Sequence, residues 1–259
     1  MNVLDSFSLK GKVALLTGGA GLYGRQLVRA LAEAGATTYL ASRNVKALEA
    51  VAVEHRALGH DVQALRLDQA DEQSILALRD EIARRSSRLD ILVNNAVARP
   101  PRNGLPGAAA LAESMAVNAT GLILLTQTLG EIIADGGSII NIGSMMGLVG
   151  VEPLNYRGTN MPAWGFPDYF FHKGGMVNVT RFWASYFGQR GVRCNCLHPG
   201  GLQTPDQPEA FVRNYNERTC LGRMANDSDL MGAVVFLASD ASRYVTGTNI
   251  PVDGGYTAK

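Results

Sequence analysis

A tyrosine and a lysine four residues apart form the pair in this sequence best suited to chemistry. Tyr169 and Lys173 follow Asp168, a residue type that caps helix N-termini. Helical periodicity continues to about Arg190, which places both side chains on one helix face. Two unit charges about 4 Å apart at an effective dielectric near 20 attract by roughly 4 kcal/mol. The ammonium would therefore lower the pKa of the phenol towards neutrality, where a tyrosine can exchange a proton.

The pair alone leaves an ordinary structural role open, with the tyrosine in the core and the lysine in solvent. The rest of the chain bears on this choice.

A predicted strand at residues 12–17, a glycine-rich loop and an amphipathic segment at 25–34 follow one another near the N-terminus. Glycines at the spacing G-x-G-x-x-G between a strand and a helix predict a dinucleotide site, with the pyrophosphate on the helix N-terminus. The loop residues expected at the cofactor are Gly18, Gly19, Gly21, Leu22, Tyr23 and Gly24.

The end of the second predicted strand, residues 37–41, bears on the choice of dinucleotide. NAD-binding units usually carry an acid about 20 residues after the glycines, which holds the ribose 2′-hydroxyl. Ser42 and Arg43 stand there instead, and no acid is present. A guanidinium can pair with a 2′-phosphate through charge-assisted hydrogen bonds. The loop predicts a preference for NADP(H), and a simply solvated Arg43 would leave NAD(H) as the alternative.

Strands and helices alternate along the whole chain, which predicts an α/β fold. Helices that follow short apolar strands imply right-handed crossovers and a parallel sheet. With no linker in the sequence, we expect a single domain over residues 1–259: a Rossmann-like doubly wound parallel sheet with helices on both faces. Further helices are predicted at 45–58, 72–85, 110–134, 169–190 and 228–238, and further strands at 62–67, 89–93, 138–142, 192–197 and 248–252.

Polar residues follow several strands at the sheet edge where a cofactor should lie. Asp68 and the run from Asn94 to Ala96 end two strands, and Ser144 ends a third. Asn94 and Ser144 can also cap neighbouring backbone, because buried polar groups need partners. Asn118 lies in an otherwise apolar helix and needs a partner for the same reason.

Composition excludes several other classes of function. The chain has 24 Lys+Arg and 23 Asp+Glu without a basic stripe, which argues against nucleic acid as a partner. The N-terminus lacks a secretory signal, and no apolar run is expected to reach the length of a membrane span, so we expect a cytoplasmic protein without membrane contact. The three cysteines lack a CxxC spacing, and no metal site is expected.

Together the motifs occur in the order and approximate spacing of a known family. The sequence resembles the short-chain dehydrogenase/reductase family, classical type, over nearly its whole length. The matching positions are Thr17 to Gly24, Asp68, Asn94-Asn95-Ala96, Asn118, Ser144, Tyr169 with Lys173, Pro199-Gly200 with Thr204, and Asp253-Gly254-Gly255.

The resemblance implies a role for each matched residue. Tyr169 would be the general acid/base and Ser144 would hold the substrate oxygen. Lys173 would lower the pKa of Tyr169 and bind the nicotinamide ribose, and Asn118 would anchor a proton-relay water. The reaction would interconvert a secondary alcohol and a ketone. Cofactor contacts would also come from Asp68, Asn94, Ala96, Pro199, Gly200, Leu202 and Thr204.

The sequence departs from the family pattern at several places. Leu22 stands where a glycine is usual, and the middle glycine is Gly21, as in the extended epimerase and dehydratase branch. Val97 replaces a glycine, and His172 is either a second titrating group or a solvated helix residue. Two alternatives therefore stay open: a sugar epimerase or dehydratase of the extended type, and a non-catalytic dinucleotide-binding regulator.

A long segment between two catalytic positions, the insertion 151–167, is the last departure. It carries Tyr156, Arg157 and Trp164, and residues 205–221 are expected to form a flap over the same site. Aromatic faces with hydrogen-bond donors favour a sugar or sugar acid as the small-molecule substrate. The alternative is that these groups face water or another subunit.

The predicted helix 169–190 carries more large aromatic residues than one core-facing stripe can hold, which indicates a homo-oligomer. The family resemblance implies that this oligomer is a tetramer.

Overall fold

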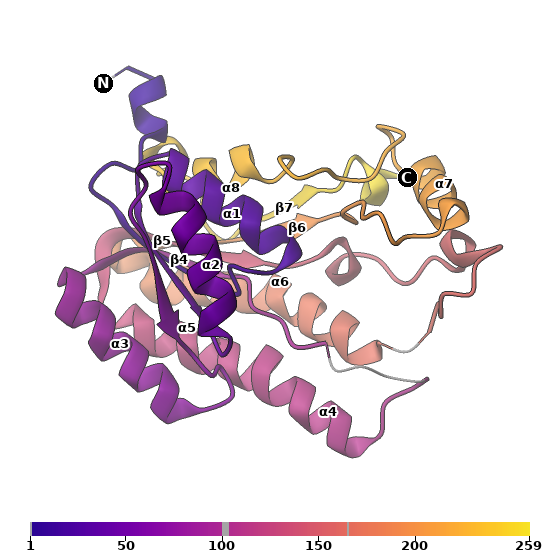
Figure 1. Ribbon diagram of the computed structural model, residues 1–259, viewed down its shortest axis with the longest axis horizontal. Coiled ribbons are helices and arrows are strands. Elements are labelled where there is room, and N and C mark those ends of the chain that lie inside the picture. The colour runs from indigo at the N-terminus through magenta and orange to yellow at the C-terminus, as the bar shows by residue number, and fades with distance from the viewer. Residues whose placement is uncertain (1, 100–103, 165) are drawn as a thin grey trace.

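A computed structural model describes residues 2–99, 104–164 and 166–259, and within them seven parallel strands form one sheet (Figure 1). The strand order is β3-β2-β1-β4-β5-β6-β7, so the direction of winding reverses between β1 and β4. This is the doubly wound Rossmann-like arrangement that the sequence predicted. The strands are β1 (Val13–Thr17), β2 (Thr37–Ser42), β3 (Val62–Arg66), β4 (Leu89–Asn94), β5 (Ile133–Ile142), β6 (Arg193–Pro199) and β7 (Asn249–Val252).

Helices cover both faces of the sheet, and each face has its own apolar core. Leu15 and Leu16 are neighbours on β1 but belong to opposite cores, because successive side chains of a strand point to opposite faces. Helices α1, α2 and α8 pack on the Leu16 face, and α3, α5 and α6 pack on the Leu15 face. The helices are α1 (Leu22–Glu33), α2 (Val45–Arg56), α3 (Glu72–Ser86), α4 (Ala108–Met115), α5 (Leu122–Gly130), α6 (Pro167–Phe187), α7 (Glu209–Arg218) and α8 (Met231–Ala238).

The prediction of a single helix at 110–134 is wrong in the interior of that range and at its end. A π-helical segment, Ala116–Gly121, separates α4 from α5, and β5 begins at Ile133. A Cβ atom at Gly121 would clash with the carbonyl oxygen of Gln69, so this close approach requires glycine. Gln69 also donates from its side chain to the carbonyl oxygen of Val117, 2.8 Å away, which satisfies a carbonyl of the π-helical segment. Such segments often occur at functional sites, and this one contains Asn118.

The start of α6 also differs from the sequence prediction. Phe166 is the N-cap and Pro167 the first helical residue, a position that proline favours. Asp168 therefore lies inside the first turn instead of capping the helix, and its carboxylate accepts a hydrogen bond from the hydroxyl of Ser114. This bond ties α6 to α4.

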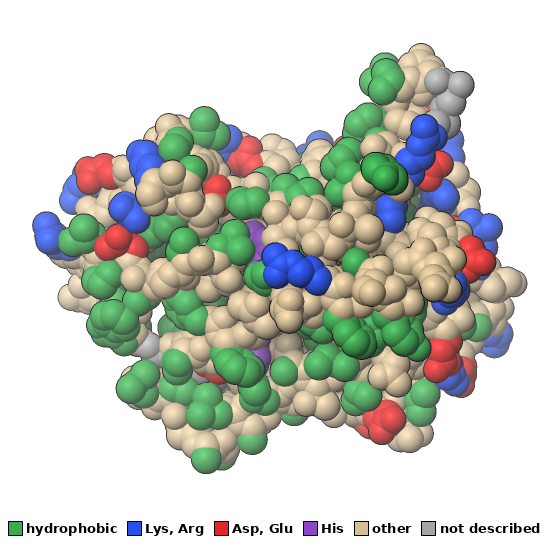
Figure 2. All heavy atoms as spheres, turned by 180° about the vertical axis from the view of Figure 1, so that it is seen from behind, with side chains coloured by type: hydrophobic (Ala, Val, Ile, Leu, Met, Phe, Trp, Pro, Cys, Tyr) green, Lys and Arg blue, Asp and Glu red, His purple; other side chains and the backbone are tan. Residues whose placement is uncertain are grey.

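One helical run, Ala108–Gly130, has 23 residues, and an 18-residue window of it has a mean hydropathy of 1.5. By length and composition alone this run could cross a membrane. The expectation that no run reaches this length is therefore wrong. Leu125 and Leu129 of this run lie in the sheet core, but only 28% of that 18-residue window is buried. Figure 2, seen from behind, shows hydrophobic side chains gathered on the lower side, where Figure 1 places α4 and α5. The run thus has an apolar face that the described chain leaves uncovered.

The insertion 151–167 and the flap 205–221 meet beyond the carboxyl ends of the strands (Figure 1, right). The insertion contains a 3-10 turn at Pro153–Tyr156, and the flap contains α7. The ring centroids of Tyr156 and Phe211 are 5.5 Å apart, and the side-chain amide of Asn155 donates to the hydroxyl of Tyr256 at 2.8 Å. The stretch 99–106 is rich in proline, and its residues 100–103 lie outside the described part of the chain.

Candidate active site

A cavity of about 1030 Å³ lies at the carboxyl ends of the strands and extends from the glycine-rich loop to Tyr169. Its volume lies at the upper end of the range usual for ligand sites. Of the residues singled out from the sequence, those that line it are Gly18, Gly21, Leu22, Tyr23, Gly24, Ser42, Arg43, Asp68, Ala96, Ser144, Tyr156, Trp164, Tyr169, Lys173, Pro199, Gly200, Leu202 and Thr204.

The glycine-rich loop fits a pyrophosphate. A Cβ atom at Gly24 would clash with the carbonyl oxygen of Gly18, and Gly18 itself has a positive φ of 72°. Helix α1 begins at Leu22 directly after Gly21, whose lack of a side chain leaves the first N–H groups uncapped for an anion. Leu22, which replaces a usual glycine, is 66% exposed and does not fill the loop.

Two residues assigned to the cofactor lie elsewhere. Gly19 faces the side chains of Leu40 and Val28, so it packs against the core. Asn94 is buried, and its side-chain amide donates to Oγ1 of Thr126 and Oδ1 of Asn141 at 3.0 and 2.8 Å. Neither residue lines the cavity, and their contact with the cofactor stays a prediction.

Asn95, which the sequence analysis did not assign to the cofactor, lines the cavity instead of its neighbour Asn94. Its side-chain amide donates to the carbonyl oxygens of Thr17 and Gly18 at 2.9 and 3.1 Å. The alternation of a strand could have indicated that Asn94 and Asn95 point in opposite directions.

The end of β2 brings a cation to the cavity. Ser42 and Arg43 both line it, and the Arg43 side chain is exposed. Its main-chain carbonyl oxygen accepts a hydrogen bond from Nη1 of Arg66 at 3.4 Å, so a second guanidinium lies beside this loop. Two positive charges here favour an anionic group over a neutral hydroxyl.

A buried histidine supports Ser144 at the end of β5. Nδ1 of His198 lies 2.8 Å from the carbonyl oxygen of Ser144, and Nε2 lies 2.8 Å from Oδ1 of Asn249. The hydroxyl of Ser144 accepts from the N–H of Met146 at 3.1 Å, which leaves its own proton to be donated to the hydroxyl of Tyr169 or, once a substrate is bound, to the substrate oxygen. His198 stands directly before the Pro-Gly motif, and its role was missed because the contact joins two strands far apart in sequence.

The structure places Lys173 and Tyr169 together on α6, as predicted. Nζ of Lys173 is 5.7 Å from the centre of the Tyr169 ring and donates to the carbonyl oxygen of Ile142 at 2.6 Å. Burial raises the pKa of Tyr169, but the charges of Lys173 and Arg99 and hydrogen bonds from Ser144 and Arg99 outweigh it, so the pKa lies below its usual value. Burial also lowers the pKa of Lys173.

Two other tyrosines of the cavity have pKa values that are shifted upward, opposite to that of Tyr169. Burial raises the pKa of Tyr23, whose hydroxyl donates to the carbonyl oxygen of Gly200. Burial likewise raises the pKa of Tyr215, whose hydroxyl accepts from the N–H of Gly201. Neighbouring cations, and not burial, therefore distinguish Tyr169 from the other tyrosines.

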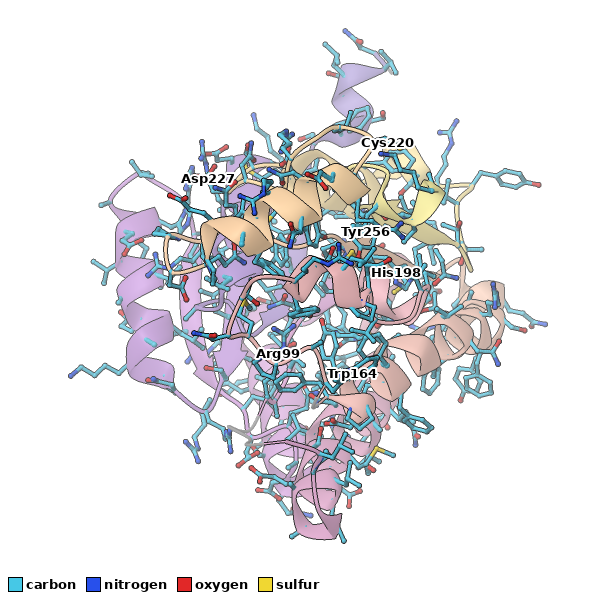
Figure 3. The ribbon with its side chains drawn as sticks, turned by 90° about the vertical axis from the view of Figure 1, so that its right-hand side faces the viewer. Arg99, Trp164, His198, Cys220, Asp227 and Tyr256 are labelled. Atoms are coloured by element: carbon cyan, nitrogen blue, oxygen red, sulfur yellow. The ribbon has the colours of Figure 1, made fainter. Side chains whose placement is uncertain are left out.

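Arg99 is a site residue that the sequence analysis missed. Its Nη2 donates to the hydroxyl of Tyr169 at 2.8 Å, and its guanidinium carbon lies 4.5 Å from the centre of that ring. Figure 3 shows Arg99 in the same opening as Trp164, below α7. Its position three residues after Ala96, in the loop that leaves β4, was the available signal.

Asn118 holds the loop after β4 in place. Its Oδ1 accepts from the N–H of Ala98 at 2.8 Å, and its Nδ2 donates to the carbonyl oxygen of Ala98 at 2.9 Å and to Oγ of Ser114 at 3.2 Å. The side chain does not line the cavity, because it is committed to these three partners. The contact of Asn118 with a relay water stays a prediction.

His172 is buried, so the interpretation as a solvated helix residue is wrong. Its Nε2 lies 3.0 Å from Oγ of Ser114 and 3.8 Å from Oδ2 of Asp168. Through Ser114 this polar cluster reaches Asn118. The cluster connects α4 and α6 behind the catalytic residues.

The insertion contributes two of its three predicted residues. Tyr156 and Trp164 line the cavity, and Trp164 is 63% exposed at the opening. Arg157 does not line it; its side chain is exposed, and its carbonyl oxygen accepts from the amide of Asn214. The assignment of Arg157 to the substrate is therefore wrong, because the chain turns it outward after the 3-10 turn. The guanidinium beside the reacting groups belongs to Arg99 instead.

Comparison with known proteins points to one family. The family model described as enoyl-(acyl carrier protein) reductase matches residues 21–257. The chain is 33% identical over 254 residues to a cis-4-hydroxycyclohexanecarboxylate dehydrogenase of Sinomonas cyclohexanicum, covering 95% of this chain and 97% of the relative. It is 34% identical over 267 residues to a galactitol 2-dehydrogenase (L-tagatose-forming) of Cereibacter sphaeroides, covering 99% of each. A crystal structure of a gluconate 5-dehydrogenase from Burkholderia cenocepacia J2315 in complex with NADP and tartrate has a TM-score of 0.86 and 31% identity, with 100% of both chains covered.

We predict that Tyr169 ionises below the usual pKa of a tyrosine. Its phenolate absorbance can be isolated as the difference between pH titrations of the wild type and Tyr169→Phe. Lys173→Met should move this ionisation to higher pH, because a phenolate loses its neighbouring cation. Lys46→Met, which removes an exposed lysine of α2, is the control and should leave the difference titration unchanged. An ionisation at or above the usual value in the wild type would contradict the assignment.

Proposed function

Since the chain belongs to the short-chain dehydrogenase/reductase family, we propose that it interconverts a secondary alcohol and a ketone with a nicotinamide cofactor, preferably NADP(H), on a polar sugar-like or sugar-acid substrate. The observation that carries the proposal is the convergence of Ser144, Tyr169 and Lys173 in one cavity with the glycine-rich loop. An acid/base tyrosine with a lowered pKa beside a dinucleotide site suits this reaction.

The side chains divide the work on the substrate oxygen. When bound, the nicotinamide cofactor supplies or accepts the hydride. Tyr169, as the phenolate, takes the hydroxyl proton of the alcohol, and in the reverse direction the phenol returns it to the ketone oxygen. Ser144 donates its hydroxyl proton to the same oxygen and so holds it beside Tyr169. Lys173 lies on the same helix, and its side chain is only 4% exposed. Its positive charge stabilises the phenolate of Tyr169.

The relay role of Asn118 is also part of the proposal. Its side chain hydrogen-bonds to Ala98 and Ser114, and so it holds the loop after β4 against the π-helical segment. We assign the water contact to the main chain of that segment.

The alternative functions have less support. The relatives compared are dehydrogenases whose whole length the chain matches, and none is an epimerase or dehydratase. The regulator alternative does not explain why Ser144, Tyr169 and Lys173 meet beside the dinucleotide loop.

The preference for NADP(H) is supported by Arg43 at the end of β2 and by Arg66 beside it. The gluconate 5-dehydrogenase similar to this chain was crystallised with NADP. NAD(H) remains the alternative cofactor.

The polar substrate class is supported by the open cavity and by the relatives. Tyr156 and Trp164 offer aromatic faces that sugars favour. The relatives act, by name, on galactitol and on a hydroxycyclohexanecarboxylate, and the structural neighbour binds tartrate. These ligands share a secondary alcohol and further oxygen atoms.

Assembly as a homo-oligomer, proposed as a tetramer, is supported by two uncovered apolar faces. Phe171, Phe182 and Tyr186 on α6 are 65%, 57% and 65% exposed. The run Ala108–Gly130 on the same side of the sheet is mostly unburied. Apolar faces of this size usually pack against a partner, here a second copy of the chain.

Tyr169→Phe should remove nearly all turnover while the affinity for the cofactor stays close to that of the wild type, because the ring remains and only the transferable proton is lost. Steady-state kinetics and cofactor titration separate the two effects. Tyr244→Phe, at a fully exposed position, should behave as the wild type. If Tyr169→Phe kept more than about a tenth of kcat, Tyr169 would not be the acid/base.

Arg43→Ala should weaken NADPH binding about 10- to 150-fold and leave NADH binding little changed, because a charged hydrogen-bond partner is worth roughly 1.5–3 kcal/mol. Calorimetric titration with both cofactors measures this. Arg29→Ala removes an equal charge on α1, outside the cavity, and should affect neither cofactor. If the kcat/KM of the wild type were higher with NADH than with NADPH, the interpretation that Arg43 selects NADP(H) would be contradicted.

Light scattering of the wild type at micromolar concentration should give a mass near four times the 27.7 kDa of one chain. Phe182→Arg should lower that mass, because it places a charge on the uncovered face of α6. Tyr244→Arg, which alters another exposed aromatic residue, should leave the mass unchanged. A wild type of monomer mass would contradict the proposal.

A further inference from the structure

The catalytic end of the cavity carries an excess of positive charge. Among the described residues that line the cavity, the cations are Arg43, Arg99 and Lys173, and the one acid is Asp68. Asp68 follows β3 and Arg43 follows β2, so both lie towards the outer strands of the sheet. Two cations therefore remain beside Tyr169 with no carboxylate among the described lining residues to balance them.

These two cations differ in what they still can bind. Lys173 is buried, and its ammonium donates to the carbonyl oxygen of Ile142 and contacts Sδ of Met176 at 3.7 Å. Arg99 is exposed to the cavity and uses one N–H, on Nη2, for the hydroxyl of Tyr169. In the described part of the chain it makes no ion pair, and a guanidinium has five N–H donors in a fixed plane. Most of its donors are therefore available to a ligand.

We propose that Arg99 is a specificity-determining residue that binds a substrate carboxylate close to the reacting carbon, so that the preferred substrates are hydroxy acids and the matching keto acids. This deepens the proposed function and rests on it.

The contact between Arg99 and Tyr169 limits where that carboxylate can lie. The reacting oxygen of the substrate must lie within about 3 Å of the Tyr169 hydroxyl for proton transfer. Nη2 of Arg99 is already 2.8 Å from the same hydroxyl. The remaining donors of this planar group are therefore close enough to reach atoms one or two bonds from the reacting carbon. A carboxylate on the adjacent carbon, or on the next one, falls within their reach, and a carboxylate at the far end of a long chain does not.

The apolar part of the cavity lining favours such an ion pair. Leu105, Val117, Phe166 and Phe170 line the same cavity, and they offer neither charge nor competing side-chain hydrogen bonds. Planar pairing of a guanidinium with a carboxylate is stronger and more directional than pairing with a neutral oxygen. Stacking of Arg99 on the Tyr169 ring keeps the guanidinium plane in place. A methyl ester or amide of the same substrate cannot form this ion pair.

A simpler role for Arg99 would be to lower the pKa of Tyr169 and nothing more. Both roles predict a loss of turnover when Arg99 is replaced, so turnover alone does not separate them. The ratio of kcat/KM for a hydroxy acid to that for its methyl ester does separate them. Both substrates use the same Tyr169, so any change in its proton transfer cancels in the ratio.

The experiment uses the full-length protein with saturating cofactor and two matched pairs: 3-hydroxybutyrate with its methyl ester, and tartrate with its dimethyl ester. The kcat/KM ratio of acid to ester is measured for the wild type, Arg99→Gln and Arg99→Lys. Calorimetric titration of the same four compounds gives the ratio of Kd values, whether or not a compound is oxidised. Arg157→Gln removes a guanidinium that lies outside the cavity and serves as the matched control.

The wild type should favour the acid about 10- to 100-fold in at least one pair, as expected for a lost charge-assisted hydrogen bond. Arg99→Gln should bring that ratio close to one. Arg99→Lys should retain part of it, because the charge stays and the planar fork is lost. Arg157→Gln should match the wild type.

Three results would overturn the inference: a wild type that treats acid and ester alike in both pairs, an Arg99→Gln ratio equal to that of the wild type, or an equal loss in Arg157→Gln. Failure of the proposed function looks different. In that case no secondary alcohol or ketone, acidic or neutral, is turned over with either cofactor, while the Kd ratios still decide the role of Arg99.

Discussion

The attraction between the Tyr169 phenolate and nearby cations is the interaction on which the rest of the site depends. Burial alone raises the pKa of a tyrosine, as it does for Tyr23 and Tyr215 in the same cavity. Lys173 and Arg99 reverse that direction for Tyr169. The structure holds Lys173 by burying it on α6 against the end of β5, so the cation cannot move away into solvent.

The parallel sheet brings these groups together, because the carboxyl ends of its strands meet at one edge. Ser144 arrives from β5 and His198 from β6, and their contact fixes the backbone that carries the serine hydroxyl. The π-helical segment adds Asn118, which holds the loop after β4 and with it Arg99. Each catalytic group is therefore placed by a contact between elements distant in sequence.

Charge and exposure divide the molecule into surfaces with different uses. The cavity carries a cation at each end, with Arg43 near the outer strands and Arg99 beside Tyr169. The faces of α6 and of the run Ala108–Gly130 are apolar and uncovered. The charged cavity suits an anionic cofactor and an oxygen-rich substrate. The uncovered apolar faces suit a second copy of the chain.

The sequence by itself determined the alternation of strands and helices, the glycine-rich loop and the pairing of Tyr169 with Lys173, because these follow from local periodicity and from spacing along one helix. Long-range packing decided the rest. It turned Asn94 inward and Asn95 toward the cavity, placed Arg99 and not Arg157 beside the phenol, and inserted a π-helical segment into a helix that looked continuous. Strand alternation makes Asn94 and Asn95 point in opposite directions, but local pattern does not say which of them faces the cavity. That choice and the other two placements depend on which distant atoms complete a hydrogen bond or exclude a side chain.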